Sequence, residues 1–440
     1  MKGRFHPILW ISACLGAALL LVGLLVEGPA AAYLGLKKII TAQDLLITDY
    51  VALAGPGAAM VNAGLVTLLC ILVIHAAKEC CNGFTIVELS LMMGFSLFGK
   101  NVLNIWPILA GTWLFSKYSG HPFSRYVGVA MLATALSPLV SYLWFGSAYA
   151  SPFLGIASGL AIGFLMPLLS AYTFQVQNGM NLYNVGFACG LLAMMFVPIL
   201  TAVGDKPETV LLWYPEENIW VIAALLLLCA ALLLTGTMWG GPRPAGVWSA
   251  WRRLLRTTGR APSDYLRMFG AGPVLINMGI NGLIGLAYIL AIDGALNGPT
   301  IGGILTLMGF AAYGKHARNI IPLMAGVTLG ALGLHQTLGA PALQLAGLFG
   351  TTLAPISGQF GWGAGILAGL LHSVVVLQTG GPVAGLNLYN NGFSGGLIAM
   401  VLYPTLMAML RRRKPELQIR DYYEAFEHDD PEPVADEGTS

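Results

Sequence analysis

The sequence predicts an all-α, polytopic membrane protein made of two inverted-topology repeats, each with about five spans and with broken or re-entrant helices. Composition is the first reason: of 440 residues, 56% are hydrophobic and 10% are charged, whereas soluble domains carry about 25% charge. An internal duplication is the second, and the placement of basic residues is the third. The net charge of +2 gives no sign of a nucleic-acid partner, and none is expected.

The duplication is visible in two blocks. Residues 49–111 align without a gap on residues 264–326 at a constant offset of 215, with 23 identical pairs in 63 positions. A second block aligns 179–187 with 385–393, and both copies contain Asn-Leu-Tyr-Asn. In membrane proteins such a repeat usually places the functional site between the two halves.

Apolar runs define the expected spans. A bilayer-crossing helix needs roughly 20 apolar residues, and runs of that kind occur at about 8–27, 50–77, 126–145, 153–173, 185–203, 219–240, 268–292, 361–379 and 392–410. The run 8–27 resembles a signal peptide, but 219–240 occupies the corresponding place before the second copy, so we expect a structural span. Shorter runs rich in Gly and Pro are expected to be broken or re-entrant: 84–99, 101–117, 300–314, 320–334 and 342–357.

Charge placement orients the spans, because basic loops stay cytoplasmic. The linker 241–267 carries six arginines and the last span is followed by Arg411-Arg412-Arg413-Lys414, whereas the loop 204–218 is acidic. The second copy therefore starts inside and the first copy starts outside, so the copies are antiparallel. We expect a first repeat with its leading helix (1–203), an external loop (204–218), a second repeat (219–410) and a disordered tail (411–440). We expect the protein to lie in the inner membrane of a cell, with both termini in the cytoplasm.

Two Asp residues stand immediately before apolar runs. Helix capping accounts for Asp49 and Asp264, since their side-chain oxygens can accept a free amide of the first turn. A role in solute binding is the alternative.

A Gly-Lys pair recurs between short apolar segments. An Asn and then a Pro follow each lysine and suggest a fresh, Asn-capped helix start: Asn104 and Pro107 after Lys100, and Asn319 and Pro322 after Lys315. If these segments are half-helices that meet inside the membrane, free amides and lysines form an anion-friendly site. A surface turn with a snorkelling lysine is the alternative, and His316 and Arg318 fit it.

Asn-rich breaks interrupt the apolar sequence in each repeat. Irregular backbone at membrane depth is tolerated only where protein or a water-filled cavity covers it, and Asn can both donate and accept hydrogen bonds. We therefore predict that the polar residues of these breaks line a solute path: Asn181, Tyr183 and Asn184, and Asn387, Tyr389 and Asn390. A plain interfacial loop is the alternative.

One acid, Glu88, lies inside an apolar run where Gly303 stands in the second copy. An intramembrane acid is a candidate for proton coupling, and pairing with a nearby cation is the alternative. The six cysteines show no metal-binding spacing, and neither a metal nor a cofactor is expected. Signatures of zinc proteases, ATPases and serine hydrolases are absent, so we do not expect an enzyme.

Over nearly its whole length the chain is similar to an uncharacterised, duplicated family of bacterial membrane proteins known as a domain of unknown function, which implies no activity. Locally, 385–392 and 179–186 resemble the Gly-Leu-x-Gly-Tyr-Asn-Gly stretch of urea transporters. That resemblance implies an inverted-repeat plan and trimers of independent pores. Both copies lack the second Gly, and the pore threonine motif has no match, so urea is not implied as the substrate.

The function expected from these observations is transport, or channel-mediated passage, of a small polar solute or small organic anion between the two repeats. Paired lysines favour an anion such as a short carboxylate, and the Asn clusters alone favour a neutral amide-like solute. The expected partners are the lipid bilayer and the solute, with self-association left open. A non-transporting scaffold, receptor or membrane enzyme of unknown activity is the alternative.

Overall fold

The structure is a computed structural model that describes residues 6–216, 219–239 and 246–413. The predicted tail beyond Arg413 and the start of the predicted linker, at 241–245, lie outside these residues. The described residues up to Met400 form one compact unit, and residues 401–413 belong to a second. The fold is helical, as predicted, and its single sheet within the described residues pairs two three-residue strands, β1 (Leu46–Thr48) and β2 (Val210–Leu212), in parallel.

The first repeat consists of helical elements in the order expected. They are α1 (Pro7–Glu27), α2 (Pro29–Ile40), α3 (Tyr50–Ala54), α4 (Pro56–Ala77), α5 (Gly83–Phe95), α6 (Trp106–Tyr118), η1 (Phe123–Arg125), α7 (Val127–Ala133), η2 (Thr134–Leu136), α8 (Ser137–Ser141), η3 (Tyr142–Gly146), α9 (Pro152–Gln177) and α10 (Asn184–Ala202).

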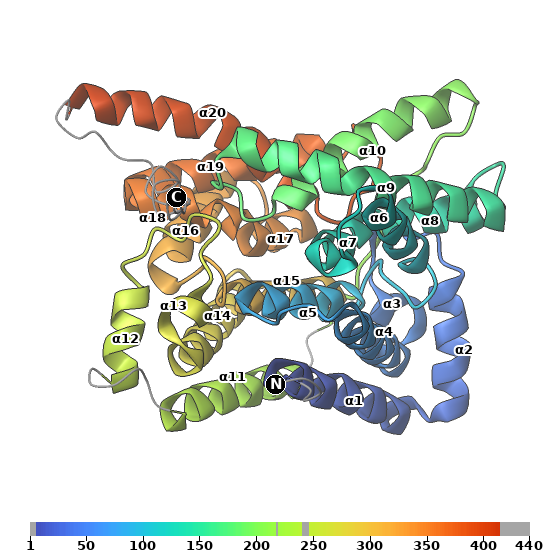
Figure 1. Cartoon of the computed structure of the whole chain (residues 1–440), viewed down its shortest axis with the longest axis horizontal. Helices are drawn as coiled ribbons and strands as arrows, with labels where there is room; N and C mark the ends of the chain where they lie inside the picture. The colour runs from blue at the N-terminus through green and yellow to red at the C-terminus, as the bar shows by residue number, and fades with distance from the viewer. Residues whose placement is uncertain (1–5, 217–218, 240–245, 414–440) are drawn as a thin grey trace, which may run out of the picture. The chain divides into compact units, whose positions relative to one another are not determined.

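The second repeat returns an equivalent series. Its elements are α11 (Ile219–Met238), α12 (Gly246–Leu254), α13 (Tyr265–Phe269), α14 (Ala271–Ala291), α15 (Gly298–Phe310), α16 (Ala317–Gly333), α17 (Pro341–Phe349), η4 (Gly350–Leu353), α18 (Ala354–Phe360), α19 (Trp362–Thr379) and α20 (Asn390–Arg413). In Figure 1, α2 to α4 lie on the right and α12 to α14 on the left, with α5 and α15 between them.

Nine segments of the described residues are long and apolar enough to cross a membrane. They correspond to the nine predicted runs, with one recurring difference. The runs 50–77 and 268–292 are each broken into a short and a long helix at Gly55 (φ 92°) and Gly270 (φ 82°). A positive φ is strained for residues with a Cβ, so the glycine sets the position of the break.

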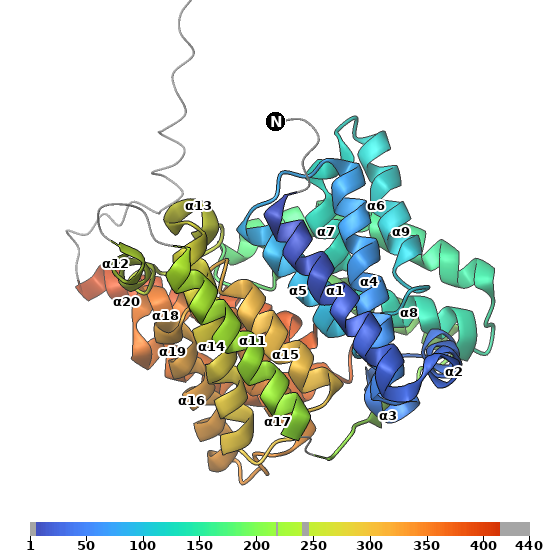
Figure 2. The ribbon, with the colours of Figure 1, turned by 90° about the horizontal axis from the view of Figure 1, so that it is seen from below.

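The outer helix of each repeat packs on the long helix that follows in the repeat. Gly16 of α1 lies against Thr67 of α4, and Gly236 of α11 lies against Ile276 of α14. Small residues allow such close approach between membrane helices. Figure 2 shows α1 running from its beginning near the N label towards α2, and α11 running in the opposite sense, towards α12.

The centre of the compact unit is the contact between α5 and α15. A Cβ on Gly94 would lie 2.9 Å from Cα of Gly302, and a Cβ on Gly309 would lie 2.6 Å from Cβ of Ser90. Since contacts move forward along α5 as they move backward along α15, these equivalent helices pack antiparallel. Glycines suit this crossing, because a Cβ on Gly94 would meet the backbone of Gly302 and a Cβ on Gly309 would meet the Ser90 side chain.

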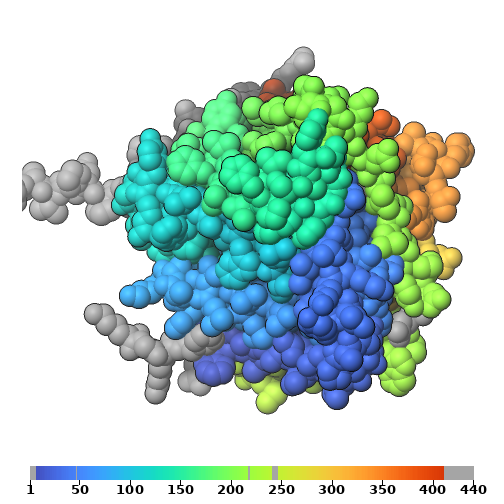
Figure 3. Space-filling view, turned by 90° about the vertical axis from the view of Figure 1, so that its right-hand side faces the viewer, coloured from blue at the N-terminus to red at the C-terminus, as the bar shows by residue number. Residues whose placement is uncertain are grey.

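Lipid-facing surface is expected on the long helices. Large apolar side chains are exposed along α9, including Phe153, Leu165, Leu168 and Tyr172. Figure 3 shows one face of the molecule, where the teal and green part of the chain lies above the blue N-terminal helices.

Candidate functional site

The two central helices, α5 and α15, each end in a tight turn, and a lysine follows each turn. Gly99 (φ 88°) and Gly314 (φ 100°) form the turns, and Lys100 and Lys315 follow them. An asparagine of the preceding long helix fixes each turn: Asn62 Nδ2 donates to the carbonyls of Ser96 (2.7 Å) and Lys100 (2.8 Å). Asn277 does the same for Ala311 and Lys315 in the second repeat.

Both lysine side chains are wholly buried, each with an exposed fraction of 0%. Each ammonium donates to a tyrosine of the opposite repeat: Lys100 Nζ to Tyr389 Oη at 2.7 Å, and Lys315 Nζ to Tyr183 Oη at 2.5 Å. The same nitrogens lie 4.8 Å and 4.4 Å from the centroids of these tyrosine rings. The predicted Lys and Tyr residues therefore form two crossed pairs, and the surface-turn alternative is wrong for both lysines.

The two pairs differ in their third member. Lys315 Nζ also donates to Thr351 Oγ1 at 2.7 Å. Lys100 Nζ instead lies 3.4 Å from Met92 Sδ, and the equivalent Thr134 hydroxyl donates to the carbonyl of Met131. Since a thioether is a weak acceptor, Lys100 has the poorer set of partners.

Neither lysine has a carboxylate counter-ion among the described residues. The ion pair recorded there joins Arg267 to Asp264 at the surface. Burying an unpaired ammonium is expensive, and charges at membrane depth tend to mark functional sites. Two lysines with only neutral partners therefore form a site that an anion would stabilise.

The Asn-rich breaks hold the two repeats together. Asn181 Nδ2 donates to the carbonyl of Gly392 (3.0 Å), and Asn387 Nδ2 donates to the carbonyl of Gly186 (3.2 Å). The Oδ1 atoms accept from the amides of Tyr183 and Tyr389, which places the two rings. Both side-chain amides are buried and form hydrogen bonds with backbone groups where the two repeats meet.

Asn184 and Asn390, the remaining members of these clusters, turn away from the crossed pairs. Asn184 Nδ2 donates to the carbonyl of Ser170 (2.8 Å), and Asn390 Nδ2 donates to Thr379 Oγ1 (3.0 Å). Their Oδ1 atoms are buried without a hydrogen-bond partner in the described part of the chain. Lining of a solute path by either side chain stays a prediction.

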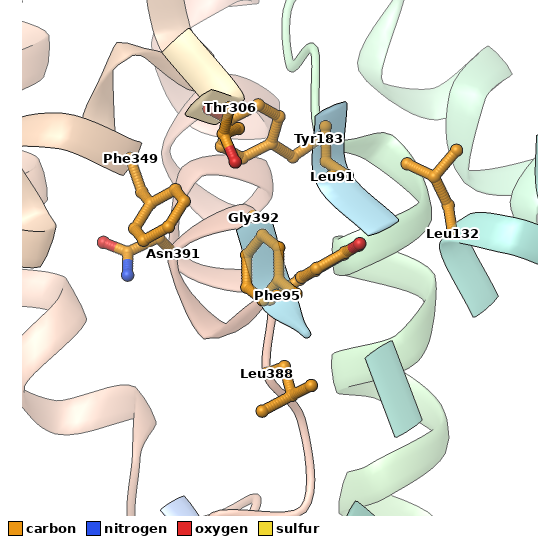
Figure 4. A pocket seen from close by; sticks show the side chains of 10 residues that line it. Leu91, Phe95, Leu132, Tyr183, Thr306, Phe349, Leu388, Asn391 and Gly392 are labelled. Atoms are coloured by element: carbon orange, nitrogen blue, oxygen red, sulfur yellow. The ribbon is translucent and has the colours of Figure 1, made fainter. Parts of the chain in front are cut away.

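A small cavity of about 10 Å³ lies between the repeats beside both tyrosines. Figure 4 shows side chains of both repeats converging on it, with Leu91, Phe95 and Leu132 from one repeat and Thr306, Phe349 and Leu388 from the other. A space of this size holds about one water molecule. The described conformation is therefore closed at the point where the lysine–tyrosine pairs meet.

Neither asparagine after the lysines is the N-cap residue that was predicted. Helix α6 begins at Trp106 without a side-chain cap, and Asn104 Nδ2 donates to Asp44, Gly99 and Ser141. Helix α16 begins at Ala317, so Asn319 lies in its first turn, where its Oδ1 accepts from the amide of the N-cap residue His316 (2.9 Å) and its Nδ2 donates to the carbonyl of Gly314. Both asparagines stabilise the Gly-Lys turn, which needs its carbonyl satisfied where water is excluded.

Asp44 has no counterpart in the second repeat and organises the first lysine turn. Its wholly buried carboxylate accepts from Tyr50 Oη (2.9 Å), Ser141 Oγ (2.9 Å) and the amides of Asn101 and Asn104. The same offset of 215 leads to Gly259, where a Cβ would lie 2.0 Å from the carbonyl oxygen of Gly314. In the second repeat, the backbone at Gly259 therefore packs against Gly314, at the place that corresponds to the Asp44 carboxylate of the first repeat.

The two Asp residues predicted as caps do cap helices. Asp49 accepts from the amide of Val51 (3.0 Å), and Asp264 from that of Arg267 (3.1 Å). Each also reaches the first residue of the other repeat's central helix, since Asp264 accepts from Gly83 (3.2 Å) and Asp49 from Gly298. Burial raises the pKa of Asp49 to about 6.

Glu88 lies on α5 and is 1% exposed. Neither of its oxygens accepts a hydrogen bond from a donor among the described residues, so the predicted alternative of a nearby cation partner has no support. His372 of α19 is wholly buried, and its Nε2 lies 3.0 Å from Asn391 Oδ1.

Sequence reasoning missed the partners that complete the site. Thr351 and Thr134 sit in a further pair of similar stretches, Thr-Ala-Leu-Ser-Pro and Thr-Thr-Leu-Ala-Pro, which a longer self-comparison finds. Asn62 and Asn277 were visible as an aligned pair without an evident role. Asp44 gave no such signal, because it is not repeated.

The fold and these crossed pairs define a polytopic, helical membrane protein with an internal duplication and two buried lysines between its repeats. The chain belongs to the family described as "Protein of unknown function (DUF1576)", whose family model matches residues 29–202 and 244–408. The expected membership of a duplicated family of unknown function is thereby confirmed, whereas the likeness to urea transporters stays a local resemblance. Neither the comparison with curated proteins nor that with solved structures gave a match.

Proposed function

We propose that this chain is a membrane transporter or channel for a small polar solute or small organic anion, with its path between the two repeats. One observation carries the proposal: Lys100 and Lys315 are wholly buried, lack a carboxylate partner among the described residues, and are each held by a tyrosine of the opposite repeat. A non-transporting scaffold has no need for two buried ammonium groups at its core.

The lysines retain donors for a substrate. An ammonium group has three N–H donors. Lys315 uses two of them on Tyr183 and Thr351, and Lys100 uses one on Tyr389 besides its weak contact with Met92. A carboxylate or a similar small anion would accept the free donors and offset the burial of the positive charge.

The repeats are proposed to lie in the inner membrane with inverted topology and with both termini in the cytoplasm. The antiparallel packing of α5 on α15 and the opposite courses of α1 and α11 support the inversion. The arginines of the linker 241–267 support the cytoplasmic assignment. In transporters built this way, one repeat moves against the other around a central site.

Transport requires that the crossing open. The cavity beside Tyr183 and Tyr389 is small and holds about one water molecule. The two lysine turns lie at the ends of α5 and α15, so a shift of these helices would change the lysine–tyrosine distances together. An arrangement with crossed pairs therefore suits alternating exposure of one site.

Solute-induced swelling of proteoliposomes tests the proposal. Purified full-length protein would be challenged with a panel of small neutral solutes and small anions, chloride and malonate included. We expect selective entry of one anion class, lost in the Lys100→Gln/Lys315→Gln double variant. Lys117→Gln removes an exposed lysine of α6 and is expected to leave entry unchanged.

Two results would count against the proposal. Unchanged entry and selectivity in the folded double variant would remove the lysines from the path. No entry of any solute, and no exchange of any labelled solute, would favour a scaffold, receptor or other non-transporting role.

A further inference from the structure

We propose that Glu88 and Glu79 form a proton-binding pair that couples anion movement to a proton and that opens to one side of the membrane only. This inference rests on the proposed transport function. It adds the coupling ion, a second carboxylate and a direction of access.

The surroundings of Glu88 favour a proton on its carboxyl group. Its carboxylate is 1% exposed and receives no hydrogen bond from a donor of the described residues. The carboxyl group within hydrogen-bonding reach is that of Glu79. Two carboxylates at such a separation cannot both ionise without a large penalty, so they share a proton.

Glu79 connects the pair to the surface. It lies in the connection between α4, which ends at Ala77, and α5, which begins at Gly83, and it is partly exposed. Thr85 Oγ1 donates to its Oε1 at 3.4 Å. Burial raises the pKa of Glu79 to about 7, so a proton can be exchanged with the solvent near neutral pH.

Helix α5 connects the pair to the lysine site. Glu88 and Met92 are four residues apart and therefore lie on the same face, about 6 Å apart along the axis. Met92 Sδ is 3.4 Å from Lys100 Nζ. A charge on Glu88 thus acts on Lys100 from one helical turn away, in a region that water does not screen.

The other groups near Glu88 are two thiols, a glycine and an aspartate that is engaged elsewhere. Two thiols contribute to its surroundings, Cys70 of α4 and Cys81 of the α4–α5 connection. Helix α7 presents Gly128, where a Cβ would lie 2.5 Å from Glu88 Oε1. Asp264 of the second repeat accepts from the amide of Gly83 at the start of α5. The surroundings therefore leave Glu79 as the group that shares the proton.

The second repeat has neither acid. Gly294 stands at the position of Glu79, and a Cβ there would lie 2.9 Å from Cδ of Gln344. Gly303 stands at the position of Glu88, and a Cβ there would lie 2.6 Å from Cδ1 of Leu348. Protons therefore reach the core from the α4–α5 side alone, which the proposed topology places in the cytoplasm.

The electrostatics give the sign of the coupling. A doubly ionised pair would place two negative charges about one helical turn from Lys100 and would weaken anion binding there. One proton from solvent, bound between the carboxyl oxygens, removes one of these charges and so strengthens anion binding at Lys100. Proton and anion therefore bind together and cross together, and no covalent bond to the solute forms.

Infrared spectroscopy of the purified full chain tests the pair without a substrate. Burial raises the pKa of Asp44 to about 8, so its carboxyl also contributes a protonated band, and the test is the difference between the unsubstituted protein and a variant. We expect one component of the band near neutral pH to be lost in Glu88→Gln and altered in Glu79→Gln, while Glu216→Gln, an exposed acid, leaves the band unchanged. A difference spectrum of Glu88→Gln that lacks this component would overturn the inference. If Glu88→Gln does not fold, the change of the component in Glu79→Gln provides the same test.

Transport then tests the coupling. In proteoliposomes containing a pH-sensitive dye, an inward gradient of malonate or chloride is expected to acidify the interior. Glu88→Gln is expected to retain exchange of the labelled anion and to lose the acidification. Anion flux with no proton movement in the unsubstituted protein would overturn the coupling but keep the proposed function, whereas no anion flux at all would overturn the proposed function itself.

Discussion

The two repeats share a scaffold and differ in their acids. Both have a glycine turn, a buried lysine and an asparagine that fixes the turn, and each lends a tyrosine to the other. At three places where the second repeat has glycine, the first repeat has a buried or partly buried acid: Asp44, Glu79 and Glu88. Symmetry therefore accounts for the paired lysines, and the asymmetry includes groups that can bind protons or organise one turn.

That division suggests how the duplication has been used. The symmetric residues stabilise the lysine turns and the contact between the repeats, where both halves need the same geometry. The asymmetric acids lie on the elements that carry Lys100 or on those next to them, whereas Lys315 has hydroxyl partners from both Tyr183 and Thr351. Substitutions in matched positions can separate these two contributions.

The largest effect is expected at Asp44. In Asp44→Ala the hydroxyls of Tyr50 and Ser141 and the amides of Asn101 and Asn104 lose a buried acceptor. Because each unsatisfied buried group costs roughly 1–3 kcal/mol, we expect a loss of about 3 kcal/mol in the free energy of unfolding. Reversible unfolding in mixed micelles measures it. A loss below that of the Asp44→Asn variant would contradict the role assigned to the carboxylate.

A smaller loss is expected at the helix crossing. A Cβ in Gly94→Ala would meet the backbone of Gly302 at 2.9 Å, and overpacking of this kind costs about 2 kcal/mol of unfolding free energy. Gly333→Ala is the matched control, since nothing lies within 4 Å of its added Cβ. Equal stability of the two variants would show that α5 and α15 do not pack as described.

The tyrosines should separate the two lysines. Tyr389→Phe leaves Lys100 with Met92 Sδ, whereas Tyr183→Phe leaves Lys315 with Thr351 Oγ1. Hydrogen bonds to charged groups contribute roughly 1.5–3 kcal/mol, so we expect a loss of about 1.5 kcal/mol for Tyr389→Phe and about half of it for Tyr183→Phe. Anion entry should fall in the same order. The reverse order in both measurements would remove the distinction between the two sites.

The sequence predicted the fold well because hydropathy and charge determine membrane helices. All nine predicted spans correspond to helical segments among the described residues. The breaks at Gly55 and Gly270 were not predicted, since hydropathy is blind to the backbone conformation of a glycine inside an apolar run. The pairing of β1 with β2 joins residues more than 160 positions apart, and no local pattern indicates it.

The site was predicted as residue types and not as contacts. Lys100, Lys315, Tyr183 and Tyr389 were chosen because they recur, yet the exchange of tyrosines between repeats follows from a crossing that the alignment does not contain. Asn104 was expected to cap a helix, and instead it donates to a buried carboxylate. Asp44 could not be found by self-comparison, because Gly259 stands at its place in the second repeat.

The smallest effect is expected at the Asp residues that tie each repeat to the other's central helix. Burial raises the pKa of Asp49 to about 6, whereas an Asp in an unfolded chain titrates near 3.9. The folded protein therefore binds this proton more tightly than the unfolded chain does. By linkage, the contribution to stability is fully present below about pH 4 and is lost as the pH rises through about 6.

Asp49→Asn removes this titration and keeps an oxygen that can accept from the amide of Val51, although the bond from Tyr214 to Oδ2 is lost. We expect the variant to show a flatter dependence of unfolding free energy on pH between about 4 and 6. Asp264→Asn makes the same change in the second repeat, where the carboxylate pairs with Arg267 at the surface. Because the Arg267 side chain is 63% exposed, solvent screens the pair, and its removal should change stability by less than about 1 kcal/mol. Equal flattening of the profile by the two variants would contradict the role given to the burial of Asp49.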